Sequence, residues 1–275
     1  MNLAVSNIAW DSSQDDATAA ALRRAGVGGV EIAPTKWRDR PLEASSADTA
    51  AYRRRWEDRG LPIVSLQALF FGRPDLQLFG EARSRAEMLA YLRGIMRVGA
   101  GLGARALVFG SPKNRLRGSL SLPQALDIAT KFFRAAGDYA REHGIALCIE
   151  ANPPAYGCDF ITTTTEAVEL CRLVDHPAIR VNADLGGMTM SNEDIGASLE
   201  SVKSFIGHFH ASEPNLVSLG AVANHAAAGS ALEAIGYMGW VSIEMRAPAQ
   251  ASGDDNVTAV DRAVQLAIGA YGRVV

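Results

Sequence analysis

The sequence predicts an α/β fold, one (β/α)8 barrel that spans residues 1–275 as a single domain. Three observations support this prediction. Short runs rich in β-branched residues alternate with longer helical patterns along the whole chain, as in parallel βα units. Eight such units need about 250 residues, which the chain provides. No Pro/Ser-rich linker or change of composition divides the chain.

The eight predicted strands are short apolar segments, each followed by a polar loop. In chain order they are residues 3–9, 29–33, 63–68, 104–110, 145–150, 179–184, 205–210 and 240–245. Their Val, Ile and aromatic side chains favour extended backbone, and runs of this length and composition are typical of buried parallel strands.

A helix is predicted after each strand, because apolar residues recur there with helical periodicity. The helices are residues 14–25, 47–59, 82–102, 122–143, 164–174, 192–203, 224–235 and 254–270. Gly26, Gly60, Gly103, Gly144 and Gly236 directly follow five of them, where a left-handed turn favours glycine. A doubly wound open sheet is the competing fold. It usually carries a glycine-rich phosphate-binding turn after the first strand, and here that turn reads AWDSSQDD.

Composition excludes several classes of protein. Lys and Arg number 27 and Asp and Glu 30, so the net charge is −3 and no basic field is available for nucleic acid. No apolar run approaches the roughly 20 residues of a membrane span, and the N-terminus lacks a secretory signal, so we expect a cytoplasmic protein without a membrane partner. Cys148, Cys158 and Cys171 lack CxxC spacing, which favours reduced thiols over disulfides or a thiolate zinc site.

Polar, metal-ligating side chains end the last four predicted strands, at the edge where barrels carry active sites. They are Glu150, Asp184, His210 and Glu244. Carboxylates that converge at the ends of apolar strands are costly to bury unless they bind a cation. Three carboxylates and one imidazole suit one divalent metal, Mn²⁺ first and Mg²⁺ or Co²⁺ next, better than a structural zinc. His208, two residues before His210, is expected to contact the site only indirectly.

The order of these residues, with the runs IEANPP, VNADLGGM, IGHFHASEP and WVSIEM, resembles the xylose isomerase-like barrel superfamily. The resemblance is to its sugar isomerase/epimerase branch, which includes the D-tagatose and D-psicose 3-epimerases and inosose-processing enzymes. It implies that Glu150, Asp184, His210 and Glu244 hold one divalent metal, and that Glu150 and Glu244 also move the substrate proton. It further implies a small-molecule carbohydrate substrate and leaves a homodimer open.

Two positions depart from the pattern of the ketose 3-epimerases. Those enzymes carry a His three residues after the metal Asp, where this chain has Gly187, and an Arg six residues after the metal His, where it has Leu216. The loss of these two substrate contacts predicts poor activity on free ketohexoses. It favours a larger or anionic substrate, such as a sugar phosphate or a sugar acid.

Polar and aromatic residues in or near other strand ends and loops are candidates for substrate contacts. The cations suit phosphate or carboxylate, and the indole offers a platform for a sugar ring. Lys36, Arg115 and His225 are equally compatible with ordinary surface residues, and the indole with ordinary packing. The candidates are Trp10, Lys36, Gln67, Lys113, Arg115, Asn152, Tyr156, Glu213 and His225.

The predicted reaction is proton transfer next to a carbonyl, with a cation stabilising the negative charge that develops. Return of the proton to the opposite face gives an epimer, and return to the neighbouring carbon gives an aldose–ketose isomer. A dehydratase of the inosose or dehydroshikimate type is the alternative enzyme, and a non-catalytic carbohydrate-binding barrel is the alternative without a metal. Endonuclease IV-like cleavage of abasic DNA is disfavoured, because it requires several metals, more histidines and a basic surface.

Overall fold

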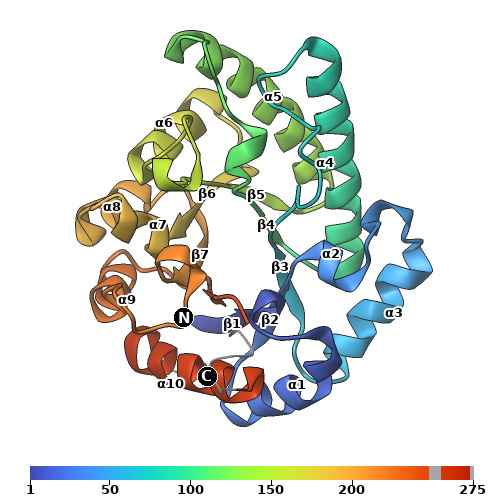
Figure 1. Ribbon diagram of the computed structural model, residues 1–275, viewed down its shortest axis with the longest axis vertical. Helices are drawn as coiled ribbons and strands as arrows, with labels where there is room; N and C mark the ends of the chain where they lie inside the picture. The colour runs from blue at the N-terminus through green and yellow to red at the C-terminus, as the bar shows by residue number, and fades with distance from the viewer. Residues whose placement is uncertain (248–254, 273–275) are drawn as a thin grey trace.

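The computed structural model describes residues 1–247 and 255–272. Its eight described strands are parallel and close into a barrel in the order β1 to β8. The predicted (β/α)8 fold is therefore confirmed. Figure 1 looks down this barrel, with the strands around the centre and the helices in an outer layer.

The strands lie where the sequence predicts them, with ends that differ by up to three residues. β1 is shorter than predicted because Asn7–Ala9 turns out of the sheet as a 3-10 helix. The strands are β1 (Asn2–Ser6), β2 (Gly29–Ile32), β3 (Ile63–Leu66), β4 (Ala106–Phe109), β5 (Ala146–Glu150), β6 (Ile179–Asp184), β7 (Ile206–Ser212) and β8 (Trp240–Glu244).

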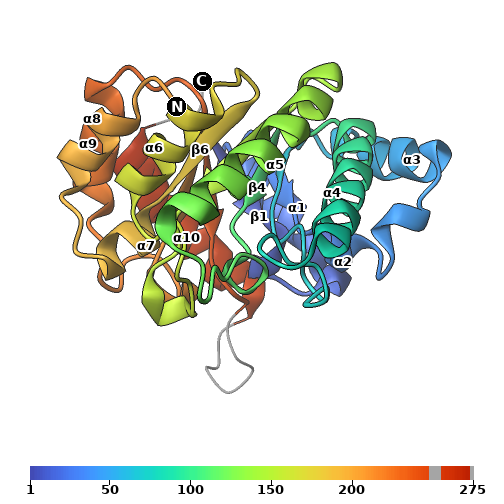
Figure 2. The ribbon, with the colours of Figure 1, turned by 90° about the horizontal axis from the view of Figure 1, so that it is seen from above.

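A helix follows each strand in the outer layer, and the five predicted terminal glycines all have positive φ, from 64° to 90°. Figures 1 and 2 show α4 and α5, the longest described helices, side by side along the barrel. Residue 254, the predicted start of the last helix, lies outside the described residues. The main helices are α1 (Asp15–Arg24), α3 (Ser46–Glu57), α4 (Ala82–Leu102), α5 (Leu122–Glu142), α6 (Thr164–Val174), α8 (Ile195–Val202), α9 (His225–Ala234) and α10 (Asn256–Tyr271).

Two short helices were not predicted, and both begin at the carboxyl end of a strand. α2 (Pro34–Trp37) follows β2, and α7 (Leu185–Met190) follows β6. No described helix is both long and apolar enough to cross a membrane.

The strand register brings the ends of β6, β7 and β8 to one edge of the barrel. Asp184 lies beside His210, and Ser212 lies beside Glu244. Apolar side chains between the strands and the helices form the core: Phe109 of β4, for example, packs edge-on against Phe133 of α5, with ring centroids 5.1 Å apart. The site below is therefore built on rigid elements.

Candidate active site

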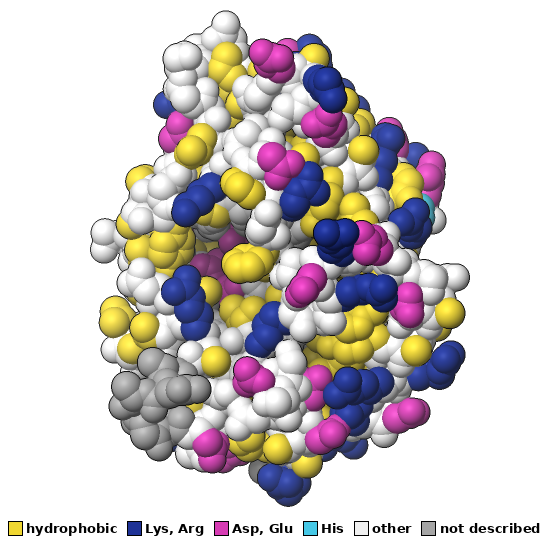
Figure 3. Space-filling model, turned by 45° about the vertical axis from the view of Figure 1, so that its right-hand side comes forward, with side chains coloured by type: hydrophobic (Ala, Val, Ile, Leu, Met, Phe, Trp, Pro, Cys, Tyr) yellow, Lys and Arg dark blue, Asp and Glu magenta, His cyan; other side chains and the backbone are white. Residues whose placement is uncertain are grey.

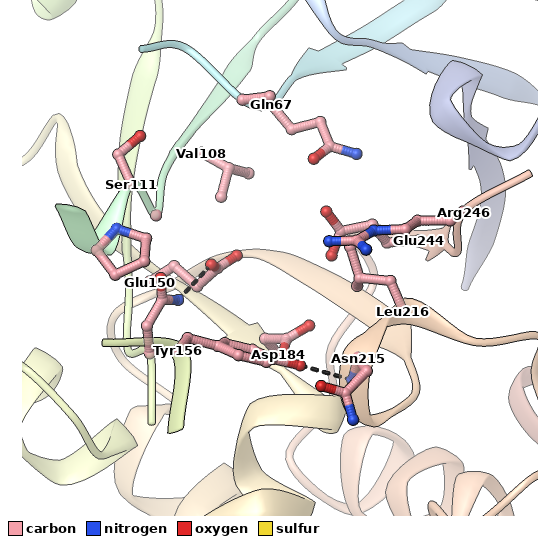
Figure 4. Close-up of a pocket in the computed structure, with 14 residues that line it drawn as sticks. Gln67, Val108, Ser111, Glu150, Tyr156, Asp184, Asn215, Leu216, Glu244 and Arg246 are labelled. Carbon is pink, nitrogen blue, oxygen red and sulfur yellow. Dashed lines mark hydrogen bonds between the residues drawn. The ribbon is translucent and has the colours of Figure 1, made fainter. Parts of the chain in front are cut away.

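A pocket of about 380 Å³ opens at the carboxyl ends of the strands. Its volume falls in the range of small-molecule sites, and its position is the one at which barrels carry their chemistry. Glu150, Asp184 and Glu244 line it, as Figure 4 shows. Figure 3 shows a hollow in the surface with acidic side chains inside it.

Strained backbone marks the wall of this pocket. Seven described residues other than glycine have positive φ, and four of them, Ala68, Ser111, Asn215 and Leu216, line the pocket. Such conformations cost about 1–3 kcal/mol each and cluster at functional sites. The strain therefore distinguishes this pocket from the other cavities of the molecule.

His210, two residues before the end of β7, lies at the centre of the four predicted residues, with Glu150, Asp184 and Glu244 at the ends of β5, β6 and β8. Its Nδ1 is 3.1 Å from Oε2 of Glu244, 3.4 Å from Oε2 of Glu150 and 4.0 Å from Oδ2 of Asp184. This nitrogen is buried and has no hydrogen-bond partner among the described residues. The structure thus brings the four predicted residues together around one unpartnered atom.

The second ring nitrogen of His210, Nε2, contacts a carboxylate that the sequence analysis did not identify. Glu31 of β2 is fully buried, and its Oε1 lies 3.2 Å from Nε2 of His210. Its Oε2 accepts hydrogen bonds from Ser65 Oγ (2.6 Å) and His208 Nε2 (3.0 Å). A proton shared with Glu31 on Nε2 leaves the Nδ1 lone pair toward the pocket, as in many metal-binding histidines. An acidic residue inside the apolar run GVEIA was the available signal.

The donor atoms fit a divalent metal. Glu150, Asp184 and His210 each place one ligand atom within 4.8 Å of the other two. Carboxylate oxygens with one imidazole nitrogen are suitable donors for several divalent ions. Glu31, His208 and His210 form a second such group, but there the imidazole and hydroxyl protons already occupy the Glu31 carboxylate. Glu244 lies next to the group of Glu150, Asp184 and His210, because its Oε2 is 3.1 Å from His210 Nδ1.

Burial and crowding move the pKa values of these groups in different directions. Burial, with Glu150 and Glu244 nearby, raises the pKa of Asp184 to about 7, and burial also raises the pKa of Glu244. Burial opposes ionisation of Glu150, but the adjacent His210 ring and hydrogen bonds from two asparagine amides hold its pKa below the ordinary value. Burial opposes the charging of His210, yet the surrounding carboxylates raise its pKa well above the ordinary value. A cluster of this kind attracts a cation, either a proton or a metal ion.

The two glutamates of the pocket are held differently. Oε1 of Glu150 accepts from Asn152 Nδ2 (2.6 Å), and Oε2 accepts from Asn182 Nδ2 (2.8 Å). Glu244 has no amide partner among the described residues, and its one close polar contact there is His210 Nδ1. Figure 4 shows the two carboxylates approaching the pocket from opposite sides. Asn182, two residues before the end of β6 and with its amide toward Glu150, was not predicted.

Asp184 also begins a helix, which explains the glycine at position 187. Its Oδ1 accepts a hydrogen bond of 2.6 Å from the backbone N–H of Gly187 and so caps α7. A Cβ atom on residue 187 would lie 3.0 Å from that oxygen, closer than ordinary contact. Glycine therefore fits this tight cap.

Three of the predicted substrate contacts line the pocket: Gln67, Asn152 and Tyr156. The Tyr156 hydroxyl accepts a hydrogen bond of 2.7 Å from the backbone N–H of Asn215, which connects the loops after β5 and β7 across the pocket mouth. Arg246 lines the pocket too and was missed. It follows Glu244 by two residues and so shares its face of the chain, which was the available signal.

Glu213 and His225 hold a loop in place, which corrects their predicted role as substrate contacts. The fully buried Glu213 carboxylate accepts from four consecutive backbone N–H groups, residues 220–223, at 2.8–3.0 Å. His225 Nε2 lies 3.1 Å from the same carboxylate, and its Nδ1 lies 2.8 Å from the Tyr271 hydroxyl. These groups anchor the loop between β7 and α9, because nearly all their polar atoms have partners within the protein.

The other four predicted contacts lie outside the pocket lining. Trp10 is fully buried, so it offers no surface for stacking. Arg115 is also buried, and its Nη2 donates a hydrogen bond of 2.6 Å to the backbone oxygen of Glu150. Lys36 donates to the backbone oxygen of Trp10 and lines a different cavity. Lys113 is exposed to solvent. Burial thus corrects the expectation for Trp10 and Arg115, whereas Lys36 and Lys113 lie outside the lining of this pocket.

The protein is thus a parallel (β/α)8 barrel with a pocket lined by carboxylates at the carboxyl ends of its strands. The chain belongs to the xylose isomerase-like TIM barrel family, whose model matches residues 19–266. This confirms the resemblance read from the sequence. No curated protein sequence matches the chain.

Several solved structures share the fold. D-psicose 3-epimerase with D-tagatose from Clostridium cellulolyticum H10 superposes with a TM-score of 0.82 at 16% identity, over 98% of this chain and 99% of that chain. The 3-keto-D-glucoside 4-epimerase YcjR from E. coli gives 0.77 at 17%, over 98% and 99%. The IOLI protein with a binding zinc atom gives 0.77 at 18%, over 98% of each chain.

Proposed function

We propose that this protein is a divalent-metal-dependent isomerase or epimerase of a sugar or sugar derivative that transfers a proton next to a carbonyl. One observation carries the proposal: the buried, unpartnered Nδ1 of His210 faces three carboxylates at 3.1–4.0 Å. An acceptor nitrogen among anionic oxygens requires a cation between them. The epimerases with the same fold support the choice of reaction. The free, buried cysteines suit a cytoplasmic enzyme.

Glu150, Asp184, His210 and Glu244 would hold one ion, for which Mn²⁺ is our first candidate and Mg²⁺ or Co²⁺ the next. Such an ion, when bound, polarises the substrate carbonyl and stabilises the negative charge that develops on its oxygen. Glu31 keeps Nδ1 of His210 toward the pocket by accepting a hydrogen bond from Nε2–H.

Glu150 and Glu244 carry the proton in this proposal. Two asparagine amides fix the orientation of Glu150, whereas Glu244 lies opposite and contacts His210 Nδ1. One carboxylate removes the proton beside the carbonyl and the other returns it. The hydrogen bond between Tyr156 and Asn215 joins the loops after β5 and β7 at the mouth of the pocket. Delivery to the opposite face gives an epimer, and loss of a β-hydroxyl instead would give a dehydratase.

Kinetics of matched variants in excess Mn²⁺ test this assignment. Glu150→Gln and Glu244→Gln should each lose at least about 10²-fold in rate, the usual contribution of a positioned acid or base. Glu169→Gln, on the exposed face of α6, is the control and should keep wild-type activity. Full activity of either pocket variant, with its metal content verified, would exclude that residue from proton transfer.

A further inference from the structure

We infer that Arg246 binds a terminal oxyanion of the substrate, a carboxylate or a phosphate, and so selects sugar acids or sugar phosphates. The inference rests on the proposed function and specifies the substrate class of the same site. Arg246 is the one Lys or Arg among the described residues that line the pocket. The cations predicted from the sequence, Lys36, Lys113 and Arg115, lie outside the lining of this pocket.

The backbone around Arg246 is fixed on both sides of the pocket mouth. Its N–H donates a hydrogen bond of 2.8 Å to the backbone oxygen of Leu216, and the next N–H, of Ala247, donates one of 2.9 Å to the oxygen of Ile8. These bonds tie the end of β8 to the loops after β7 and β1. In Figure 4 the Arg246 side chain extends from this tether into the pocket, near Leu216 and Glu244. The backbone that carries the side chain is therefore held at the mouth before a ligand arrives.

The guanidinium of Arg246 is available for a ligand. Within the part of the chain that the structure describes, its side chain has no hydrogen bond and no carboxylate within the 4.0 Å of an ion pair, whereas Arg115 and Lys36 donate to backbone oxygens. The neighbouring Leu216 side chain is apolar and offers no competing acceptor. A planar guanidinium with free donors is the side chain best matched to a carboxylate or phosphate.

The distribution of charge fixes the direction in which such a substrate binds. Three carboxylates surround His210 at the floor of the pocket, and one divalent ion would offset only two of their three negative charges. An anionic group is therefore disfavoured beside the floor carboxylates and favoured at Arg246. The carbonyl end then faces the floor and the anionic end faces the mouth.

Binding of three unreactive polyols to the Mn²⁺-loaded protein tests the inference without turnover. D-Glucitol, D-gluconate and D-glucitol 6-phosphate are acyclic polyols that differ chiefly in the terminal group, and their Kd values can be measured by calorimetry. Wild-type protein should bind at least one of the two anions about tenfold or more tightly than D-glucitol, the usual gain from a charge-assisted contact. The anion that shows the gain identifies the carboxylate or the phosphate as the preferred group.

Arg246→Gln should remove this preference and leave D-glucitol binding unchanged, while Arg246→Lys should retain part of it. Arg97→Gln, on the exposed side of α4, removes the same charge far from the pocket and should change neither. Equal wild-type affinity for all three polyols would overturn the inference. So would an anion preference that persists in Arg246→Gln, because the anion would then bind the metal or another cation such as Lys113. Failure of the proposed function is distinguishable, since it would appear as wild-type protein that binds no divalent metal.

Discussion

Replacement of Glu31 by Gln tests whether the Glu31 carboxylate, inside the barrel, keeps the Nδ1 atom of His210 free to bind a metal in the pocket. The Glu31 carboxylate accepts hydrogen bonds from three buried groups: Ser65 Oγ at 2.6 Å, His208 Nε2 at 3.0 Å and His210 Nε2 at 3.2–3.3 Å. A glutamine at position 31 offers one acceptor oxygen in place of two, and its NH2 group would point at hydrogen-bond donors instead of acceptors. At least one buried donor therefore loses its partner.

The magnitude follows from these contacts. One unsatisfied buried donor costs about 1–3 kcal/mol of stability. The imidazole of His210 also loses the acceptor that holds the proton on Nε2, and loss of such a partner typically lowers metal affinity about 10–100-fold. We expect Glu31→Gln to fold, to bind Mn²⁺ 10–100-fold more weakly, and to regain most of its activity when the metal is saturating.

Competition with a chelator of known affinity, followed by titration of Mn²⁺ at constant pH, gives the required dissociation constants. Ser65→Ala is the matched control, because it removes one hydrogen bond to Glu31 and leaves the Glu31–His210 contact in place. Its affinity should stay near that of wild type. Wild-type affinity in Glu31→Gln would refute the orienting role of this carboxylate.

Four other predictions follow from the same geometry. The pKa of Asp184 is raised to about 7, so the metal-free folded protein keeps a proton that the unfolded chain releases near pH 3.8, and the melting temperature of the metal-free protein should fall as the pH rises from 3.8 to 7. Excess Mn²⁺ should raise the melting temperature more at pH 8 than at pH 5. A melting temperature that does not change with pH, with or without Mn²⁺, would contradict this prediction. Asp184→Asn should lose bound metal and turnover while the circular dichroism spectrum is retained; normal metal content would count against the ligand assignment. Glu213→Ala should lower the free energy of unfolding in urea by at least about 3 kcal/mol, because four backbone N–H groups lose their acceptor, with metal affinity unchanged as the check on its separate role. Free D-fructose, D-psicose and D-tagatose should give poor kcat/KM; efficient epimerisation of any of them would contradict the expected substrate class.

The sequence contained enough information for the barrel and for the strand-end cluster, because both depend on local patterns. Alternating apolar strands and helices define the βα units, and a side chain at the end of a strand faces the pocket or not according to the two-residue period. Glu150, Asp184, His210 and Glu244 could therefore be found from their positions alone. The position of Glu31 followed the same rule, but a single acidic residue within a strand has no local partner to reveal its role.

Loop residues could not be placed in this way. Glu213 and Arg246 both closely follow a strand, yet one turns inward to bind four backbone N–H groups and the other extends into the pocket. That difference depends on loop backbone with positive φ at Asn215 and Leu216 and on a hydrogen bond between loops distant in sequence. Trp10 and Arg115 likewise became buried through tertiary packing, which composition and spacing do not determine.

The most direct test of metal-assisted proton transfer is incorporation of solvent deuterium, followed by NMR. Wild-type protein with Mn²⁺ in D2O is incubated with ketoses, ketose phosphates and keto sugar acids, and each product is isolated. We predict one deuterium at the carbon beside the carbonyl of the preferred substrate, with its epimer or isomer formed, and no exchange in Glu150→Gln or Glu244→Gln. Tight binding of a sugar derivative and of metal, with no exchange in any substrate, would contradict the proposed enzyme and favour a carbohydrate-binding barrel.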